Sequence, residues 1–243
     1  MNTAALIAAA SILLSACAAT AAPAPVAPPQ AFDPMIRDGV LSARLSIPDS
    51  GQPAIEAGVW LPTEAAAEPR PLIVISHGNG GDFRSHHDTA AALAKAGFVV
   101  AALTHTGDNW RDQSRATDIV GRTRQLSVLI DYMTKDWSAR AGIDAGRIGA
   151  FGFSAGGFTV LAAAGGDPDL GRLTDHCSAN PGFYDCRLIG QHAGTMKEAA
   201  AAPRLPHDAR LKALVVAAPA LGFTFTKDGL RNVTQPIQLW QAG

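Results

Sequence analysis

Short runs of consecutive apolar residues recur along most of the chain. The segments 71–78 (PLIVISHG), 98–105 (FVVAALTH) and 147–154 (RIGAFGFS) have this character, and so do 211–219 and 235–241. Such runs are typical of strands that are buried on both faces of a sheet. The pattern predicts a central, mainly parallel sheet.

Segments with a helical period separate these runs. The residues 84–96, 116–136 and 155–164 are helical in period, and the middle segment keeps one apolar face. Strands that alternate with helices indicate βαβ units, in which helices cover both faces of the sheet. Earlier in the chain, 40–47 and 55–62 alternate apolar and polar residues, which predicts an antiparallel hairpin. The fold class is therefore α/β.

One segment, 165–210, interrupts this alternation. It is polar, contains prolines, and holds Cys177 and Cys186. We expect it to form a lid over the carboxyl edge of the sheet. In an oxidising compartment the two cysteines can close a small loop as a disulfide, although two free thiols remain an alternative. Their spacing does not fit zinc, so no metal site is predicted.

The N-terminal residues 1–21 form a short apolar run that ends in small residues, as an export signal does. Two cleavage sites compete: a lipobox-like LSAC, which would leave a lipid on Cys17, and cleavage before Ala22. An apolar helix retained in the fold is a third alternative, and the first ten residues lack the usual Lys or Arg. The hypothesis is an exported protein that is periplasmic, membrane-anchored through Cys17, or secreted.

A Pro/Ala-rich tether, 22–32, follows the apolar run, and the folded domain is predicted over 33–243. A hydrophobic content of 47% with 17% charged residues is typical of a globular protein. The net charge of −1 gives no reason to expect a nucleic-acid partner.

The sequence GFSAGG at 152–157 has the G-x-S-x-G form of a nucleophile elbow, and it stands between a predicted strand and a predicted helix. In that context Ser154 is the candidate nucleophile. Gly152 and Gly156 would allow the strand and the helix to approach closely. The alternative is a glycine-rich turn with an idle serine.

A second glycine-rich loop, HGNGG at 77–81, follows the predicted strand 71–78. Gly78 and Gly80 would let its backbone amides turn toward a ligand. The N–H groups of Asn79 and Ala155 are the candidate oxyanion-hole donors, because such amides stabilise charge on a carbonyl oxygen. A βα turn without catalytic duty is the alternative.

The loop HGNGG, the elbow GFSAGG, the segment THTGDNWRDQS and the cysteine-containing insertion together resemble the predicted dienelactone-hydrolase branch of the α/β-hydrolase superfamily. Bacterial polyester hydrolases and platelet-activating-factor acetylhydrolases are more distant relatives. The resemblance implies ester hydrolysis through an acyl-enzyme on Ser154, a small-molecule ester substrate and no cofactor. True dienelactone hydrolases carry a cysteine in the elbow, so Ser154 argues against the reaction in the branch's name.

The fold places its triad residues in the order serine, acid, histidine. In the family the acid commonly follows the strand that corresponds to 235–241, and the histidine follows one more strand. On that alignment the chain lacks the last strand, the last helix and both partners of Ser154. Candidate substitutes within the chain are His176, His192 and His207, with Asp228 as the acid; solvated or lid-forming side chains are the alternative.

Residues of the loop after 98–105 complete the candidate site. His105, Asp108 and Trp110 are predicted to line the substrate cleft, with surface packing as the alternative. The favoured interpretation is an exported serine esterase, represented by a fragment. The alternative is an inert surface protein of hydrolase fold that binds an apolar ligand or a partner. An acyl transferase would carry the same elbow.

Overall fold

The structure, a computed structural model, describes residues 35–37, 40–64, 66–201 and 205–241. The predicted export signal, with its lipobox at Cys17, and the tether at 22–32 lie outside the described residues. Among the described residues, no helix has the length and apolar character that crossing a bilayer requires.

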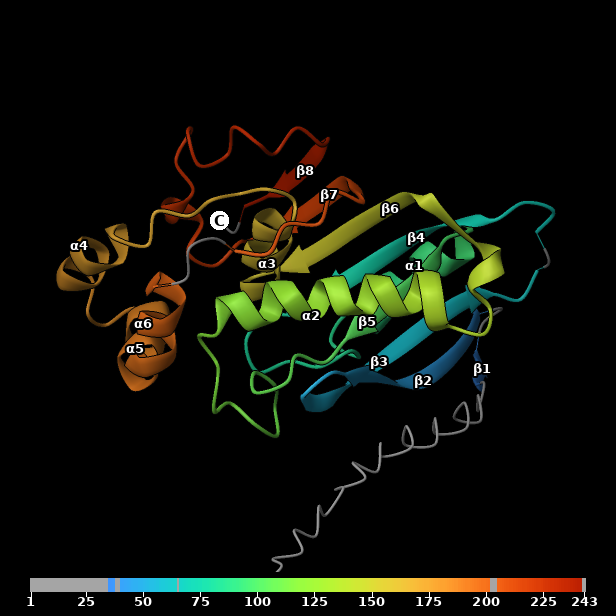
Figure 1. Ribbon diagram of the computed structural model, residues 1–243, viewed down its shortest axis with the longest axis horizontal. Helices are drawn as coiled ribbons and strands as arrows, with labels where there is room; N and C mark the ends of the chain where they lie inside the picture. Colours follow the sequence, from blue (N-terminus) through green and yellow to red (C-terminus); the bar gives the residue numbers. More distant parts are fainter. Residues whose placement is uncertain (1–34, 38–39, 65, 202–204, 242–243) are drawn as a thin grey trace, which may run out of the picture. The chain divides into compact units, whose positions relative to one another are not determined.

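An eight-stranded sheet forms the centre, with the strand order β1-β2-β3-β5-β4-β6-β7-β8 (Figure 1). The strands are β1 (Met35–Arg37), β2 (Val40–Asp49), β3 (Gln52–Pro62), β4 (Arg70–Ser76), β5 (Val99–Leu103), β6 (Ile143–Phe153), β7 (Leu211–Ala217) and β8 (Ile237–Trp240). The first three strands pair antiparallel, and β3 joins β5 antiparallel. The remaining pairs, from β5 through β4 and β6 to β8, are parallel. The predicted hairpin and mainly parallel sheet are therefore confirmed.

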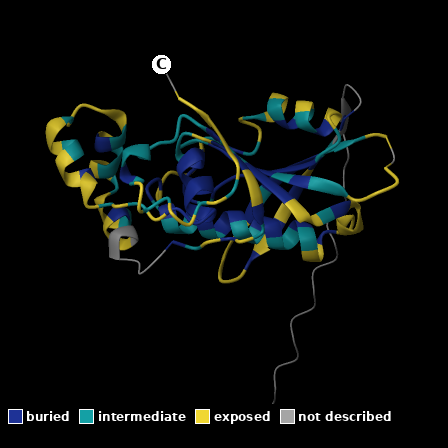
Figure 2. Cartoon of the chain, turned by 90° about the horizontal axis from the view of Figure 1, so that it is seen from above, coloured by how far each residue is buried: buried dark blue, intermediate teal, exposed yellow. Residues whose placement is uncertain are grey.

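Helices cover both faces of this sheet, as predicted. The α-helices are α1 (His87–Lys95), α2 (Ile119–Asp131), α3 (Ala155–Ala163), α4 (Arg172–Ala179), α5 (Tyr184–Gln191) and α6 (Ala193–Ala201). Side chains of α2 and α3 share the larger apolar core with one face of the sheet. Those of α1 pack in a second core with Val100 and Ala102 of β5. The buried strands form the middle layer between helices in Figure 2.

The segment 165–210 forms α4, α5 and α6, which we call the cap. Figure 1 shows it beyond the carboxyl ends of the parallel strands. The predicted disulfide between Cys177 and Cys186 is present and links α4 to α5, with the two Cα atoms 5.3 Å apart. Between α5 and α6, the carbonyl of His192 accepts a hydrogen bond from Thr117 Oγ1 at 3.1 Å. The cap is thus linked internally and bonded to the segment that precedes α2.

Strand β8 stands at one end of the described sheet. Its side chains Ile237, Leu239 and Trp240 are 41%, 63% and 58% exposed. This outer strand therefore carries apolar side chains that the described residues leave uncovered.

Candidate active site

Ser154 lies between the last residue of β6 and the first residue of α3. Its backbone angles are φ 54° and ψ −117°, a conformation that costs free energy in a residue with a Cβ. Three backbone bonds hold it there: its N–H donates to Ala217 at 3.0 Å, and its carbonyl accepts from Phe158 at 3.1 Å and from Ala220 at 2.9 Å. Among the described residues, no hydrogen bond engages its hydroxyl. The strained turn therefore presents a free hydroxyl.

Two glycines make this turn sterically possible. A Cβ at Gly156 would lie 1.9 Å from the carbonyl oxygen of Ser76, and a Cβ at Gly152 would lie 2.1 Å from the carbonyl oxygen of Gly156. Helix α3 thus approaches β4 and β6 closer than any side chain would allow. The spacing of the G-x-S-x-G motif has this direct geometric cause.

The loop after β4 lies beside the serine. A Cβ at Gly78 would be 3.4 Å from the Cβ of Ser154. Within the described part of the chain, neither the N–H of Asn79 nor that of Ala155 has a hydrogen-bond acceptor, and Ala155 is the first residue of α3. Two free amides near a hydroxyl are the arrangement that stabilises an oxyanion. The structure thus brings together Ser154 and both candidate donors.

A buried ion pair anchors this loop. Arg122 Nη1 and Asp108 Oδ2 lie 2.5 Å apart, and their side chains are only 3% and 1% exposed. The other carboxylate oxygen of Asp108 accepts from Asn79 Nδ2 at 2.6 Å and from the N–H of Gly80 at 3.0 Å. Arg122 also donates to the carbonyl of His77 and, at 3.1 Å, to Thr159 Oγ1 of α3. One guanidinium therefore connects the candidate oxyanion loop to the helix that follows the serine.

Arg122 was not predicted from the sequence as part of the site, although the sequence contains a signal for it. Arg122 follows Ile119 by three residues and precedes Leu126 by four, so it lies on the apolar face of its helix. A charge on that face indicates a buried partner, because an unpaired buried charge is very costly. Which partner it meets depends on the tertiary structure.

The prediction that His105 and Asp108 line the cleft is wrong, because both are fully buried. His105 Nε2 lies 2.8 Å from Ser76 Oγ, and its Nδ1 lies 2.9 Å from Gln125 Oε1. Both side chains instead bond to residues at the end of β4 and in the loop that follows it: His105 to Ser76, and Asp108 to Asn79 and Gly80. Trp110 is 58% exposed beside the Arg111 guanidinium, outside the cavity described next.

A cavity of about 70 Å³ separates Ser154 from the cap. Its polar boundary includes Asn79, Arg122, Ser154, Tyr184 and Asp185. Its apolar lining comes from α2, α3, α5, α6 and the loops beside them: Ala116, Ile119, Phe158, Leu188, Ile189, Met196, Ala220 and Leu221. The candidate nucleophile thus opens into an apolar chamber whose roof is the cap.

None of the seven histidines, all of them in described segments, lines this cavity. His176 Nε2 lies 3.0 Å from Asp185 Oδ2, and its ring stacks on Phe223 at 4.1 Å. His192 is half-buried, and His207 and Asp228 are exposed. Among the described acidic residues of the cap, only Asp185, which was not among the candidates named from the sequence, lines the cavity.

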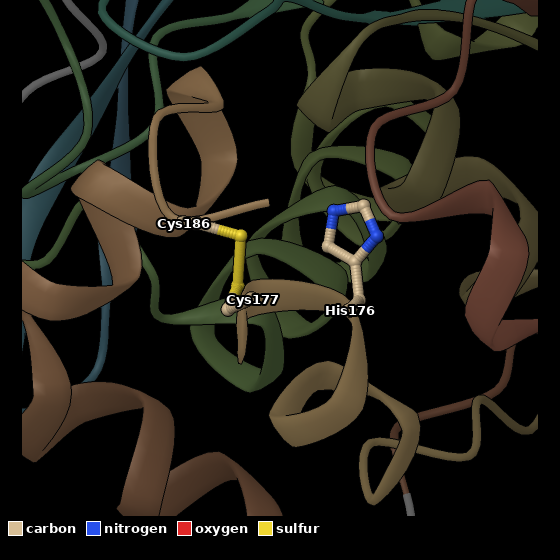
Figure 3. A group of neighbouring side chains, drawn as sticks. All are labelled: His176, Cys177 and Cys186. Carbon is tan, nitrogen blue, oxygen red and sulfur yellow. A yellow bond between two sulfur atoms is a disulfide. The ribbon is translucent and has the colours of Figure 1, made fainter. Parts of the chain in front are cut away.

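His176, Cys177 and Cys186 gather in one place, with their ligand-type atoms within 4.8 Å of one another (Figure 3). The two sulfur atoms are bonded to each other, so neither is available as a thiolate ligand. In this state the group is a cross-link between helices.

Two histidines beneath the site make stability depend on pH. Burial, and then the charge of Arg122, lower the pKa of His77 to about 3; the same causes hold the pKa of His105 well below its usual value. Both are therefore neutral when folded and become protonated near pH 6.5 when unfolded, so their stabilisation is complete above pH 6.5 and decreases below it. Lowering the pH from 7.5 to 5 should therefore reduce the free energy of unfolding by about 2 kcal/mol through His77, and His105 acts in the same direction.

Urea unfolding at pH 7.5 and pH 5 checks this expectation. His105→Gln should flatten the pH dependence, whereas His207→Gln, at an exposed position, should leave it as in the wild type. An equal pH dependence in the His105→Gln variant and the wild type would contradict the assignment.

Comparisons with known proteins agree with this geometry. A model of the prolyl oligopeptidase family matches residues 84–187. A putative esterase, NocK, from Nocardia uniformis subsp. tsuyamanensis is 28% identical over 159 residues, which is 61% of this chain and 46% of NocK. A bis(hydroxyethyl) terephthalate hydrolase from Streptomyces coelicolor is 33% identical over 117 residues, 46% of this chain and 34% of that enzyme. The chain spans less than half the length of these curated relatives.

Solved structures share the fold at low sequence identity. A ferulic acid esterase from Streptomyces cinnamoneus has a TM-score of 0.51 at 18% identity, covering 85% of this chain and 66% of that one. A cold-adapted esterase from an Arctic intertidal metagenomic library has a TM-score of 0.51 at 13% identity, covering 85% and 74%. The chain therefore has the α/β-hydrolase fold, with a strand–serine–helix turn at Ser154. Its place in the dienelactone-hydrolase-like branch stays a prediction.

Proposed function

We propose that this chain carries the nucleophile and oxyanion hole of a serine hydrolase that cleaves carboxylic esters. The observation that carries the proposal is Ser154 itself, held at φ 54° with an unengaged hydroxyl that faces an apolar cavity. A strained serine persists only where the surrounding structure imposes it, and such strain concentrates at active sites. The esterase and terephthalate hydrolase among its sequence relatives support the same chemistry.

In the proposed reaction, Ser154 Oγ attacks the ester carbonyl and its proton passes to a general base. The N–H groups of Asn79 and Ala155 donate to the oxyanion of the tetrahedral intermediate. The intermediate collapses, the C–O bond to the alcohol breaks, and the alcohol leaves with the proton. Water then attacks the acyl-enzyme by the same route and releases the carboxylic acid.

The general base is the part of this mechanism that the described residues leave unassigned, because none of their histidines lines the cavity. We assign the base and its acid partner to a part of the protein outside residues 1–243. The coverage of the curated relatives supports this assignment, since residues 1–243 match less than half of each. Ser154 should then react slowly in this chain alone, by several orders of magnitude relative to a complete triad.

The cavity indicates the substrate class. Its lining is apolar except at the boundary formed by Ser154 and its neighbours, so it suits the apolar part of a small ester. The export signal and the lipobox at Cys17 belong to the same proposal: an esterase outside the cytoplasm, with membrane attachment through Cys17 if the lipobox is used.

Reaction with a fluorophosphonate probe tests the proposal. Labelling of the folded chain of residues 1–243 should be slow and confined to Ser154, so Ser154→Ala should remove it. Ser114→Ala replaces a serine outside the cavity lining and should label like the wild type. Mass spectrometry of the labelled peptide identifies the residue, and circular dichroism confirms folding.

The same assay separates the alternatives. A folded chain that never reacts would contradict the hydrolase and favour a binding protein of the same fold. Fast labelling that His176→Ala abolishes would instead place the base in the cap, paired with Asp185.

A further inference from the structure

We infer that Tyr184, on the cap helix α5, is a positioning residue for the oxyanion hole. The inference deepens the proposed function and rests on it for its catalytic meaning. It names a residue outside the elbow and the glycine-rich loop, and it couples the disulfide-linked cap to the catalytic backbone.

The contact that carries the inference joins two segments far apart in the sequence. The Tyr184 hydroxyl donates to Asn79 Oδ1. On the other side of the same amide group, Asn79 Nδ2 donates to Asp108 Oδ1 at 2.6 Å. The Asn79 side chain is therefore held from two sides, by the cap and by the buried ion pair.

This matters because Asn79 has the only side chain beyond Cα between Gly78 and Gly81. The three glycines around it have no side chains that contacts with other residues could hold in place, and glycine is the residue with the most conformational freedom. Fixing the Asn79 amide is thus the direct way to fix the orientation of the Asn79 N–H. A donor aimed in advance at the oxyanion is the main source of catalysis in such sites.

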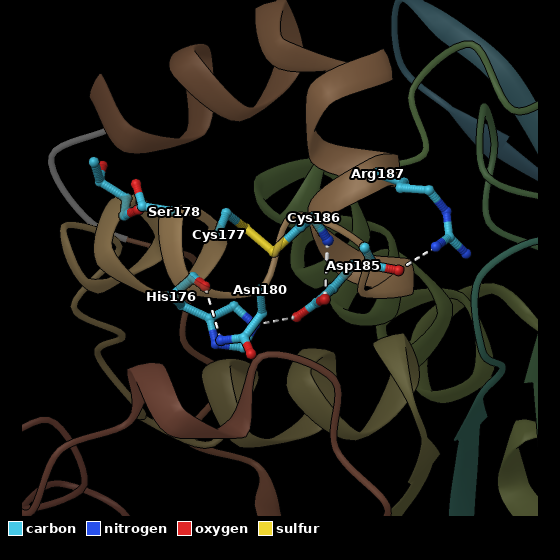
Figure 4. Close-up of a disulfide and its surroundings, with 9 residues drawn as sticks. His176, Cys177, Ser178, Asn180, Asp185, Cys186 and Arg187 are labelled. Atoms are coloured by element: carbon cyan, nitrogen blue, oxygen red, sulfur yellow. Dashed lines mark hydrogen bonds and ion pairs between the residues drawn. A yellow bond between two sulfur atoms is a disulfide. The ribbon is translucent and has the colours of Figure 1, made fainter.

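The position of Tyr184 is itself fixed from α4. The two residues that follow Tyr184 are both linked to that helix: Asp185 to His176 at 3.0 Å, and Cys186 to Cys177 by the disulfide (Figure 4). Helix α5 has only eight residues, and a helix of that length is not stable on its own. The disulfide and the His176–Asp185 contact therefore hold the tyrosine in place, and with it the Asn79 amide.

Tyr184 and Asn79 also line the cavity together with Ser154. Their bond consequently lies at the boundary of the substrate chamber, where the cap meets the loop. Cap position and donor orientation change together in this arrangement, so a disturbance of the cap should reach the oxyanion hole.

Hydrogen exchange measured by mass spectrometry tests the coupling without any need for activity. In Tyr184→Phe, amides of the 77–83 peptide should exchange about threefold to fivefold faster than in the wild type, the factor that one hydrogen bond supplies. Cys177→Ser/Cys186→Ser should accelerate the same peptide. Tyr132→Phe, which alters the other tyrosine of the chain, is the matched control and should leave it unchanged.

The labelling kinetics of Ser154 give the catalytic readout. The maximal rate of fluorophosphonate labelling should decrease about threefold to fivefold in Tyr184→Phe, while the probe concentration at half-saturation stays constant. A weakened pocket would raise that concentration instead. Equal exchange of the 77–83 peptide in wild type and Tyr184→Phe overturns the inference. A wild type that exchanges as expected but never labels overturns the proposed function and leaves the coupling established.

Discussion

Replacement of Arg122 by methionine is expected to lower the free energy of unfolding by about 3–5 kcal/mol. The change leaves the Asp108 carboxylate without a cation. Because the Asp108 side chain is only 1% exposed, water cannot replace the lost partner. It also removes the donors to Thr159 and to the carbonyl of His77. Breaking a buried pair by removing one partner costs far more than the pair itself contributes.

Urea unfolding measures this loss, and an exposed ion pair supplies the control. Lys135 pairs with Asp131, and the two side chains are 64% and 46% exposed, so Lys135→Met should cost only about 1 kcal/mol or less. In the double variant Arg122→Met/Asp108→Asn, the destabilisation should be clearly smaller than the sum of the single effects, because the two side chains share one interaction. Equal losses in Arg122→Met and Lys135→Met would show that the buried pair contributes no more to stability than an exposed pair.

Alanine at Gly156 is expected to destabilise the fold by about 3 kcal/mol or more and to stop labelling of Ser154. Its Cβ would lie 1.9 Å from the Ser76 carbonyl oxygen and 2.8 Å from that of His77. Both are backbone atoms at the end of β4, so no side-chain rotation can relieve the overlap. Helix α3 would have to move away from the sheet, and the Ala155 donor would move with it.

Gly190→Ala is the matched control, because that glycine lies in α5 with no atom within 4 Å of the added Cβ. It should be neutral or stabilise the chain by about 0.5–1 kcal/mol. Urea midpoints and fluorophosphonate labelling are measured for both variants. A Gly156→Ala chain with wild-type stability and labelling would mean that the close approach of α3 to β4 is not required.

These expectations share one structural cause. The serine, the loop and the cap are each held by atoms of another segment: Ser154 by Ala217 and Ala220, Asn79 by Asp108 and Tyr184, and α5 by α4. An active site assembled in this way is preorganised, since its donors need not reorient during the reaction.

Much of the fold could be predicted from local patterns. The consecutive apolar runs at 71–78, 98–105 and 147–154 became β4, β5 and β6, because strands covered on both faces tolerate few polar side chains. The elbow could be recognised because the steric requirement for glycine on either side of Ser154 arises within five consecutive residues. The disulfide was predicted from two cysteines that are nine residues apart in the sequence.

Other features could not be predicted because they depend on segments distant in the sequence. His105 and Asp108 have polar side chains in a loop, so the cleft was their natural assignment; their burial follows from Gln125 and Arg122 on α2, which the strand order brings beneath them. The Tyr184–Asn79 bond joins residues 105 apart in the chain. No pattern of spacing reports such a contact.

By itself, the sequence determined the elements of this protein, their α/β class and the candidate nucleophile, because periodicity and glycine placement are local consequences of backbone geometry. The tertiary structure alone decided which polar groups are buried together, what fills the space above Ser154, and which side chains hold its oxyanion loop. Those outcomes depend on packing between elements, where a charge is tolerated only if a distant partner meets it.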